Sequence, residues 1–94
     1  LDISHTVMAC NFYKWDLKSF IKKIAKYVSH LHISDAQGVD GEGVEMGFGD
    51  VNFESLFQIL DENTPNISFI PEIWQGHKND GEGFWKALEY LEKV

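Results

Sequence analysis

The sequence contains no arginine, and it has eight lysines and fifteen acidic residues, so that its formal net charge is −7. Proteins that bind nucleic acid neutralise phosphates with a basic face, and anionic membrane surfaces attract the same kind of face. The composition therefore argues against both partners. Five lysines do cluster, but they alternate with apolar residues at helical spacing, which indicates a solvated helix face: Lys14, Lys18, Lys22, Lys23 and Lys26.

Cysteine and long apolar runs are equally scarce. Cys10 is the only cysteine, which excludes an internal disulfide and favours a reducing compartment, so we expect a cytoplasmic protein. No apolar run approaches the roughly 18 residues that span a bilayer, so we expect no membrane partner. The chain opens on Leu1 and enters a strand-like segment at once, which indicates that residues 1–94 are a fragment of a longer chain.

The sequence is rich in apolar side chains, and their spacing changes several times along the chain. Hydrophobic residues make up 44% and aromatic residues 14%, which is typical of a chain with a buried core. Period-two runs predict strands at 1–4, 30–33 and 67–74, and helical spacing predicts helices at 17–28, 53–60 and 84–91. Asn52 is the expected cap of the second helix and Thr64-Pro65-Asn66 its end, and we expect polar loops at 38–49 and 76–83.

A strand followed by a helix, three times in succession, predicts an α/β fold of parallel (β/α) units with right-handed crossovers. Parallel sheets are covered on both faces, and three units alone leave open edges. We therefore expect a partial (β/α)8 barrel domain over residues 1–94. The remainder of the barrel would come from the same chain or another chain, and a second copy is also a candidate partner.

Polar residues follow each predicted strand. Asp2 and His5 come after the first, His32 and Asp35 after the second, and Glu72 lies near the end of the third. In a barrel of parallel strands these ends meet at one rim, which carries the active site. Imidazole and carboxylate together suit Mn²⁺, Zn²⁺, Co²⁺ or Fe²⁺ better than an all-oxygen calcium site.

Each of these residues has a structural alternative. Asp2 can be a turn residue, and His5 can belong to the approach to a helix. His30 and His32 are two apart and face the same side, so one of them is expected to pack rather than bind, and His32 lies nearer the rim. Glu72 sits on an otherwise apolar strand, where a cation or a proton would have to compensate a buried carboxylate.

Four phrases of the sequence resemble, in order, the last three βα units of the xylose isomerase-like barrels. They are Leu-Asp-Ile-Ser-His (1–5), His-Leu-His-Ile-Ser-Asp (30–35), Gly-Phe-Gly-Asp-Val-Asn-Phe (47–53) and Ile-Pro-Glu-Ile (70–73). That superfamily holds sugar and sugar-phosphate isomerases and epimerases, together with the endonuclease IV group. The resemblance implies the C-terminal part of a TIM barrel, with three of its eight βα units.

The resemblance also implies residue roles. In the epimerase branch, one divalent metal ion (Mn, Zn, Co, Fe or Mg) would be held by Asp2, His32 and Glu72, with a further glutamate from an earlier strand. Glu72 would act as the base that removes a proton beside a sugar carbonyl to give an enediolate. His5 would contact the sugar or sugar-phosphate substrate and take part in catalysis. Without the upstream glutamate, we expect the isolated chain to be inactive.

Several alternatives stay open at this stage. One is a metal-dependent lyase or dehydratase on the same barrel, and another is a non-catalytic sugar-binding domain fused to a sialic-acid-synthase-like enzyme. An endonuclease is disfavoured, because Asp40-Gly41-Glu42 stands where that group has an Asp-x-His pair. Residues 39–45 are expected to form a mobile lid or a solvated turn. Asp35 and Lys78 are further candidates for contact with the substrate.

Overall fold

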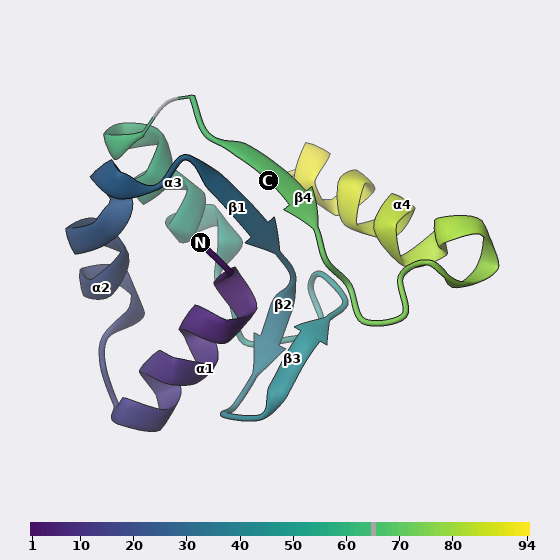
Figure 1. Ribbon diagram of the computed structural model, residues 1–94, viewed down its shortest axis with the longest axis horizontal. Coiled ribbons are helices and arrows are strands. Elements are labelled where there is room, and N and C mark those ends of the chain that lie inside the picture. Colours follow the sequence, from purple (N-terminus) through teal and green to yellow (C-terminus); the bar gives the residue numbers. More distant parts are fainter. Residues whose placement is uncertain (65) are drawn as a thin grey trace.

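The computed structural model describes residues 1–64 and 66–94, and Figure 1 shows their helices and strands. The helices are α1 (Ile3–Tyr13), α2 (Leu17–Ile24), the short 3₁₀ helix η1 (Ala25–Tyr27), α3 (Phe53–Asn63) and α4 (Lys78–Glu92). The strands are β1 (His30–Ile33), β2 (Asp35–Gln37), β3 (Gly41–Val44) and β4 (Ser68–Pro71).

The central feature is a short parallel sheet. β1 and β4 pair in parallel, with His30 opposite Ser68 and Ile33 opposite Pro71. The N-terminal residues lie along the other edge of β1, where Asp2 forms a parallel bridge with His32 and the His32 N–H donates to the Leu1 carbonyl at 2.9 Å. Three chain segments therefore run in parallel in sequence order, which confirms the predicted α/β class.

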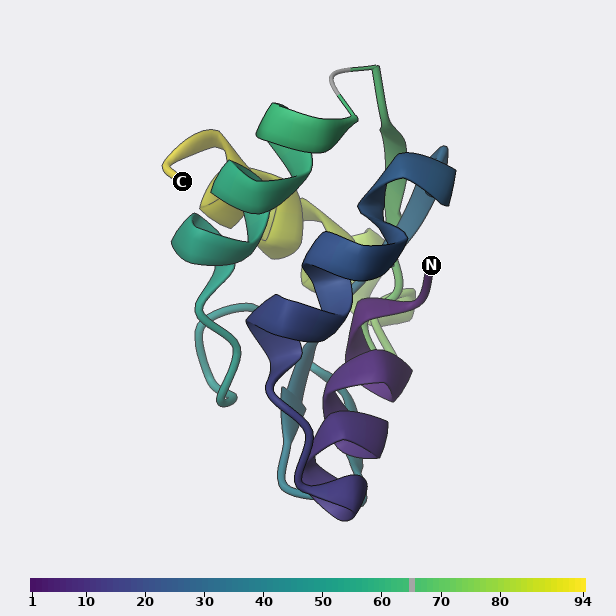
Figure 2. The ribbon, with the colours of Figure 1, turned by 90° about the vertical axis from the view of Figure 1, so that its left-hand side faces the viewer.

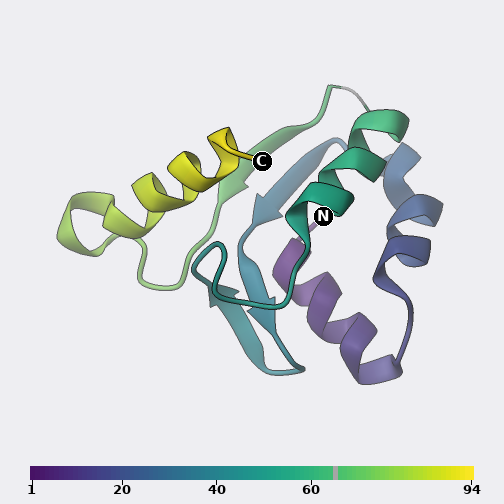
Figure 3. The same cartoon turned by 180° about the vertical axis from the view of Figure 1, so that it is seen from behind.

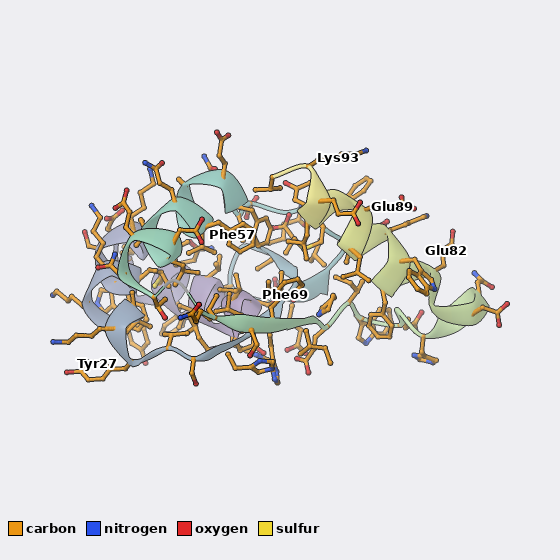
Figure 4. All side chains as sticks on the ribbon, turned by 90° about the horizontal axis from the view of Figure 1, so that it is seen from above. Tyr27, Phe57, Phe69, Glu82, Glu89 and Lys93 are labelled. Carbon is orange, nitrogen blue, oxygen red and sulfur yellow. The ribbon has the colours of Figure 1, made fainter. Side chains whose placement is uncertain are left out.

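The two faces of this sheet differ in character. Leu31 and Ile33 are buried in the hydrophobic core, and they line a cavity together with Phe57 of α3 and Leu91 of α4. Figure 3, which views the molecule from behind, shows α3 and α4 lying over the strands. Figure 4 shows Phe69 of β4 on the same side of the sheet as Phe57 of α3. His30, which is exposed, lies on the opposite face, so the helices cover only one side of the sheet.

The predicted helices form for the expected local reasons. The Asp16 carboxylate accepts the Ser19 N–H at 3.0 Å and caps α2, and the Asn52 side chain does the same for α3 with Ser55 at 3.1 Å. Figure 2 shows α1, α2 and α3 side by side. α3 ends at Asn63, as predicted, and Pro65 of the expected stop lies outside the described residues. Within the described ranges, no helix combines the length and apolar character needed to cross a bilayer.

Two elements differ in kind from the sequence expectation, and the strand predicted at 67–74 is shorter, since β4 covers Ser68–Pro71. The predicted strand 1–4 pairs only through Leu1 and Asp2, and α1 begins at Ile3 because the Asp2 carboxylate caps it by accepting the His5 N–H at 2.9 Å. Residues 38–49 are not one open loop, because β2 and β3 form an antiparallel hairpin that reaches into this segment. Both corrections concern residues just beyond the ends of parallel strands.

The last helix keeps part of the predicted loop. α4 formally begins at Lys78, but Asn79, Asp80 and Gly81 have left-handed backbone angles. Regular helix geometry therefore starts only after Gly81, and the turn at 76–81 agrees with the polar loop expected at 76–83.

The Asp35 carboxylate organises the segment between the hairpin and α3. The residue is only 1% exposed, and one carboxylate oxygen accepts N–H groups from Ala36 (2.9 Å) and Val51 (3.1 Å). The other oxygen accepts the N–H groups of Gly47 and Gly49, both at 3.0 Å. One carboxylate thus satisfies four backbone donors of an irregular segment, which fixes the path of the chain from β3 to α3.

We predict that Asp35→Asn lowers the free energy of unfolding by about 3 kcal/mol, because the amide NH₂ of asparagine would face two backbone donors that now bind an oxygen. Urea denaturation followed by circular dichroism measures this change. Asp50→Asn is the matched control, since that exposed side chain accepts, among the described residues, only the Gly38 N–H, at 2.9 Å, and the substitution should cost less than about 1 kcal/mol. Equal losses in the two variants would contradict the role given to Asp35.

Candidate functional site

Three of the predicted site residues meet where the parallel segments end. Asp2, His32 and Glu72 each offer one ligand atom, and these atoms all lie within 4.8 Å of one another. Within this group, which we call the rim cluster, His32 Nδ1 lies 3.0 Å from Glu72 Oε2. The structure therefore brings together the three residues that the sequence placed at one rim.

The strand register explains this convergence. Asp2 bridges His32 directly, and the Glu72 N–H donates to the Ile33 carbonyl at 2.8 Å, so that parallel pairing continues one residue beyond β4. His32 lies opposite Ile70, two residues before Glu72, and strand alternation sends all three side chains to one face. The sheet geometry alone is sufficient to place two carboxylates beside one imidazole.

His30 shares this face but not the cluster. Its ring packs edge-on against His32, with 5.3 Å between the ring centroids, and its Nδ1 lies 2.8 Å from the Ser68 hydroxyl. The choice of His32 over His30 as the residue at the rim thus agrees with the geometry, because His30 lies two residues further from the rim along β1.

The rim cluster is open to solvent on this part of the molecule. The side chains of Asp2, His32 and Glu72 are 31%, 42% and 48% exposed. The expectation that Glu72 is buried on an apolar strand is wrong, because Glu72 follows β4 and its carboxylate pairs with His32. The convergence of three donor atoms, and not a buried charge, is therefore the feature that suits a ligand at this site.

His5 lies beside the rim cluster, in the first turn of α1. Its Nδ1 is 3.0 Å from Asp2 Oδ1, and its Nε2 is 2.6 Å from Glu42 Oε2. The hydrogen bond to the Asp2 carboxylate is the main cause that raises the pKa of His5 above its ordinary value, and Glu42 adds to it. His5 thus lies between two carboxylates, one of which belongs to the cluster.

A cavity of about 310 Å³ adjoins these groups. Its lining includes Asp2, His5 and Glu72 from the predicted set, and Glu42 and Trp74, which sequence reasoning did not assign to the site. Trp74 is 72% exposed and follows Glu72 by two residues. The spacing of two residues from Glu72 could have predicted that Trp74 lies on the same side of the chain. The contact of Glu42 depends on a hairpin that the sequence pattern does not predict.

Hydrogen bonds of Gly43 hold the hairpin in place beside this cavity. The Gly43 N–H donates to the hydroxyl of the buried Ser4 at 3.0 Å, and the Trp74 N–H donates to the Gly43 carbonyl at 2.9 Å. Gly43 has φ +64°, and a Cβ there would lie 3.0 Å from Trp74 Cβ and 3.1 Å from its backbone nitrogen. Residues 41–44 are therefore an anchored strand, and the exposed turn is confined to the residues before them.

The other two predicted contacts lie elsewhere. Lys78 is exposed and lines a neighbouring cavity of about 420 Å³ together with Glu45 and Glu82. Asp35 is buried, and all of its described contacts are the backbone donors named above. The prediction that Asp35 contacts substrate is therefore corrected, because its carboxylate holds the chain and does not face a cavity.

Comparison with known protein families gives a match over the whole given sequence. Residues 1–94 match the family model described as a xylose isomerase-like TIM barrel. No curated protein and no solved structure matches the chain significantly. The matched range contains every residue of the rim cluster as well as His5.

We predict that Gly43→Ala destabilises the protein by about 3 kcal/mol, because the new methyl group adds a clash with Trp74 to the cost of a left-handed backbone. Gly38→Ala is the matched control, since Gly38 has φ +60° but no atom within 4 Å of the added methyl group. It should cost only about 1 kcal/mol. Thermal unfolding of the two variants measures the difference, and equal costs would show that the hairpin is not held against Trp74.

Proposed function

Because the chain belongs to the xylose isomerase-like TIM barrel family, we propose that it carries part of the active site of a sugar or sugar-phosphate isomerase or epimerase that uses one divalent cation. Membership supports a sugar-processing enzyme superfamily and identifies the parallel βα units as part of a TIM barrel. The observation that carries the more specific proposal is the convergence of Asp2, His32 and Glu72 at the strand ends.

The donor set of the rim cluster fits such a cation. Two carboxylates and one imidazole suit Mn²⁺, Zn²⁺, Co²⁺, Fe²⁺ or, less selectively, Mg²⁺. A bound divalent cation supplies Lewis-acid polarisation of a substrate carbonyl. In this proposal Asp2, His32 and Glu72 hold the ion, and the fourth ligand is a glutamate from an earlier strand of the barrel.

The protein groups themselves handle the proton. Glu72 is proposed as the base that removes the proton from the carbon beside the carbonyl, which leaves an enediolate, and a second, protonated carboxyl group from the rest of the barrel returns a proton and becomes a carboxylate. His32 Nδ1 lies 3.0 Å from Glu72 Oε2, so the imidazole and this carboxylate are close enough to hold the same ion. His5 lines the same cavity and is proposed to contact the substrate there.

The uncovered sheet face supports the remaining partner expectations. On β4, Ile70 lies opposite His32 and is 48% exposed, although it belongs to a parallel strand. Parallel sheets are normally covered on both faces. We propose that the other barrel strands, contributed by the same chain or by another chain, cover the face of the sheet that carries Ile70. A second copy of the chain is the alternative occupant, and the cytoplasm stays our expectation for location.

We predict that His32→Ala weakens binding of Mn²⁺ roughly a hundredfold, because one of the ligand atoms is lost. Titration calorimetry measures the affinity. His30→Ala is the matched control, since His30 lies on the same strand and face but its Nδ1 contacts Ser68. Similar affinities for the two variants would contradict the proposed metal site.

We predict that the full-length protein, loaded with Mn²⁺ in D₂O, introduces deuterium at a carbon beside the carbonyl of a sugar or sugar phosphate, and that Glu72→Gln slows this exchange about a thousandfold. Proton NMR of a panel of aldoses, ketoses and their phosphates detects the exchange. Loss of water from the labelled product would identify a lyase or dehydratase instead. Absence of exchange across the panel would contradict the proposed function.

A further inference from the structure

We infer that Glu42 is a positioning residue that fixes the imidazole of His5 at the edge of the cavity. This inference rests on the proposed function for the role of His5, but the contact itself is independent of that function. Glu42 belongs to β3 and His5 to α1, and 36 intervening residues separate them in the sequence.

The ring of His5 is held at both nitrogens. Nδ1 lies 3.0 Å from Asp2 Oδ1, and Nε2 lies 2.6 Å from Glu42 Oε2. A single contact would leave the imidazole free to turn about the axis of that hydrogen bond. Two contacts on opposite sides of the ring define both its position and its plane, which is the geometry that a substrate-contacting histidine requires.

The backbone beside Glu42 is itself fixed. Its neighbour Gly43 donates to Ser4, the neighbour of His5, and accepts the N–H of Trp74. Ser4 is 2% exposed, so this part of the hairpin is fastened to a buried group. Consecutive residues of β3 thus contact consecutive residues of α1, and Glu42 reaches His5 from an anchored strand.

Stability does not account for this contact. The side chains of His5 and Glu42 are 62% and 57% exposed, and exposed ion pairs contribute little to the free energy of folding. The hairpin is already held by Asp35, Ser4 and Trp74 through buried or backbone contacts. A carboxylate that adds little to folding, and that lines the same cavity as Glu72, is better explained by its effect on His5.

The test compares three variants of the full-length protein. Glu42→Ala removes the contact, and Glu42→Gln keeps an oxygen that accepts the Nε2 proton. Glu45→Ala is the matched control, because this substitution removes the same charge from the same part of the chain. The Glu45 carboxylate forms its ion pair with Lys86, at 3.9 Å, and not with His5. All three should unfold within a few degrees of the wild type.

The first measurement is the mobility of the His5 ring, from NMR relaxation of a ¹³C-labelled imidazole assigned with His5→Gln. We expect greater ring mobility in Glu42→Ala, and wild-type mobility in Glu42→Gln and Glu45→Ala. Unchanged mobility in Glu42→Ala would overturn the inference. This measurement needs no substrate, so it decides the inference even if the proposed function fails.

The second measurement is the rate of solvent exchange into the sugar that the wild type accepts. We expect Glu42→Ala to lower kcat about tenfold, with KM and Mn²⁺ affinity within about twofold of the wild type, and Glu42→Gln to restore most of the loss. A loss of Mn²⁺ affinity as large as that of His32→Ala would overturn the inference, because Glu42 would then be a ligand.

Discussion

The site depends on one constraint, the parallel register that joins Leu1–Asp2 to β1 and β1 to β4. Because Asp2 bridges His32 and pairing continues through Ile33 to Glu72, the three chain segments end at the same level. A shift of one residue in either pairing would send alternate side chains to the opposite face and separate the donor atoms. The rim cluster is therefore a consequence of the parallel sheet, and α1 and β3 contribute His5 and Glu42 around it.

A second level of organisation surrounds this sheet. The buried Asp35 carboxylate binds four backbone donors and fixes the chain between the hairpin and α3, while Gly43 joins the hairpin to Ser4 and Trp74. These hydrogen bonds join backbone groups or have buried acceptors, so they contribute more to the free energy of folding than exposed ion pairs do. The solvent-exposed ion pairs near the cavity, such as that of His5 with Glu42, can then fix the positions of side chains while they contribute little to the stability of the fold.

The sequence predicted what depends on short-range periodicity and on the order of strands and helices. The amphipathic helices, the strand at 30–33 and the meeting of Asp2, His32 and Glu72 follow from those two signals. The helix α1 was missed because its apolar and polar residues do not separate into faces, with Val7 buried but Phe12 67% exposed. Asp35 was misassigned because its four partners lie up to 16 residues away in an irregular segment, where no period relates them.

The charges around the cavity bear on which branch of the family the chain resembles in chemistry. Asp2, Glu42 and Glu72 bring three carboxylates to one cavity, and the sequence has no arginine to offset them for a phosphodiester backbone. Where the endonuclease group has a histidine, Glu42 instead contacts His5, so the same position supplies negative charge that a DNA strand would disfavour. A divalent cation and a sugar rich in hydroxyl groups meet no such repulsion. The electrostatics of the cavity therefore favour the sugar chemistry proposed above over cleavage of nucleic acid.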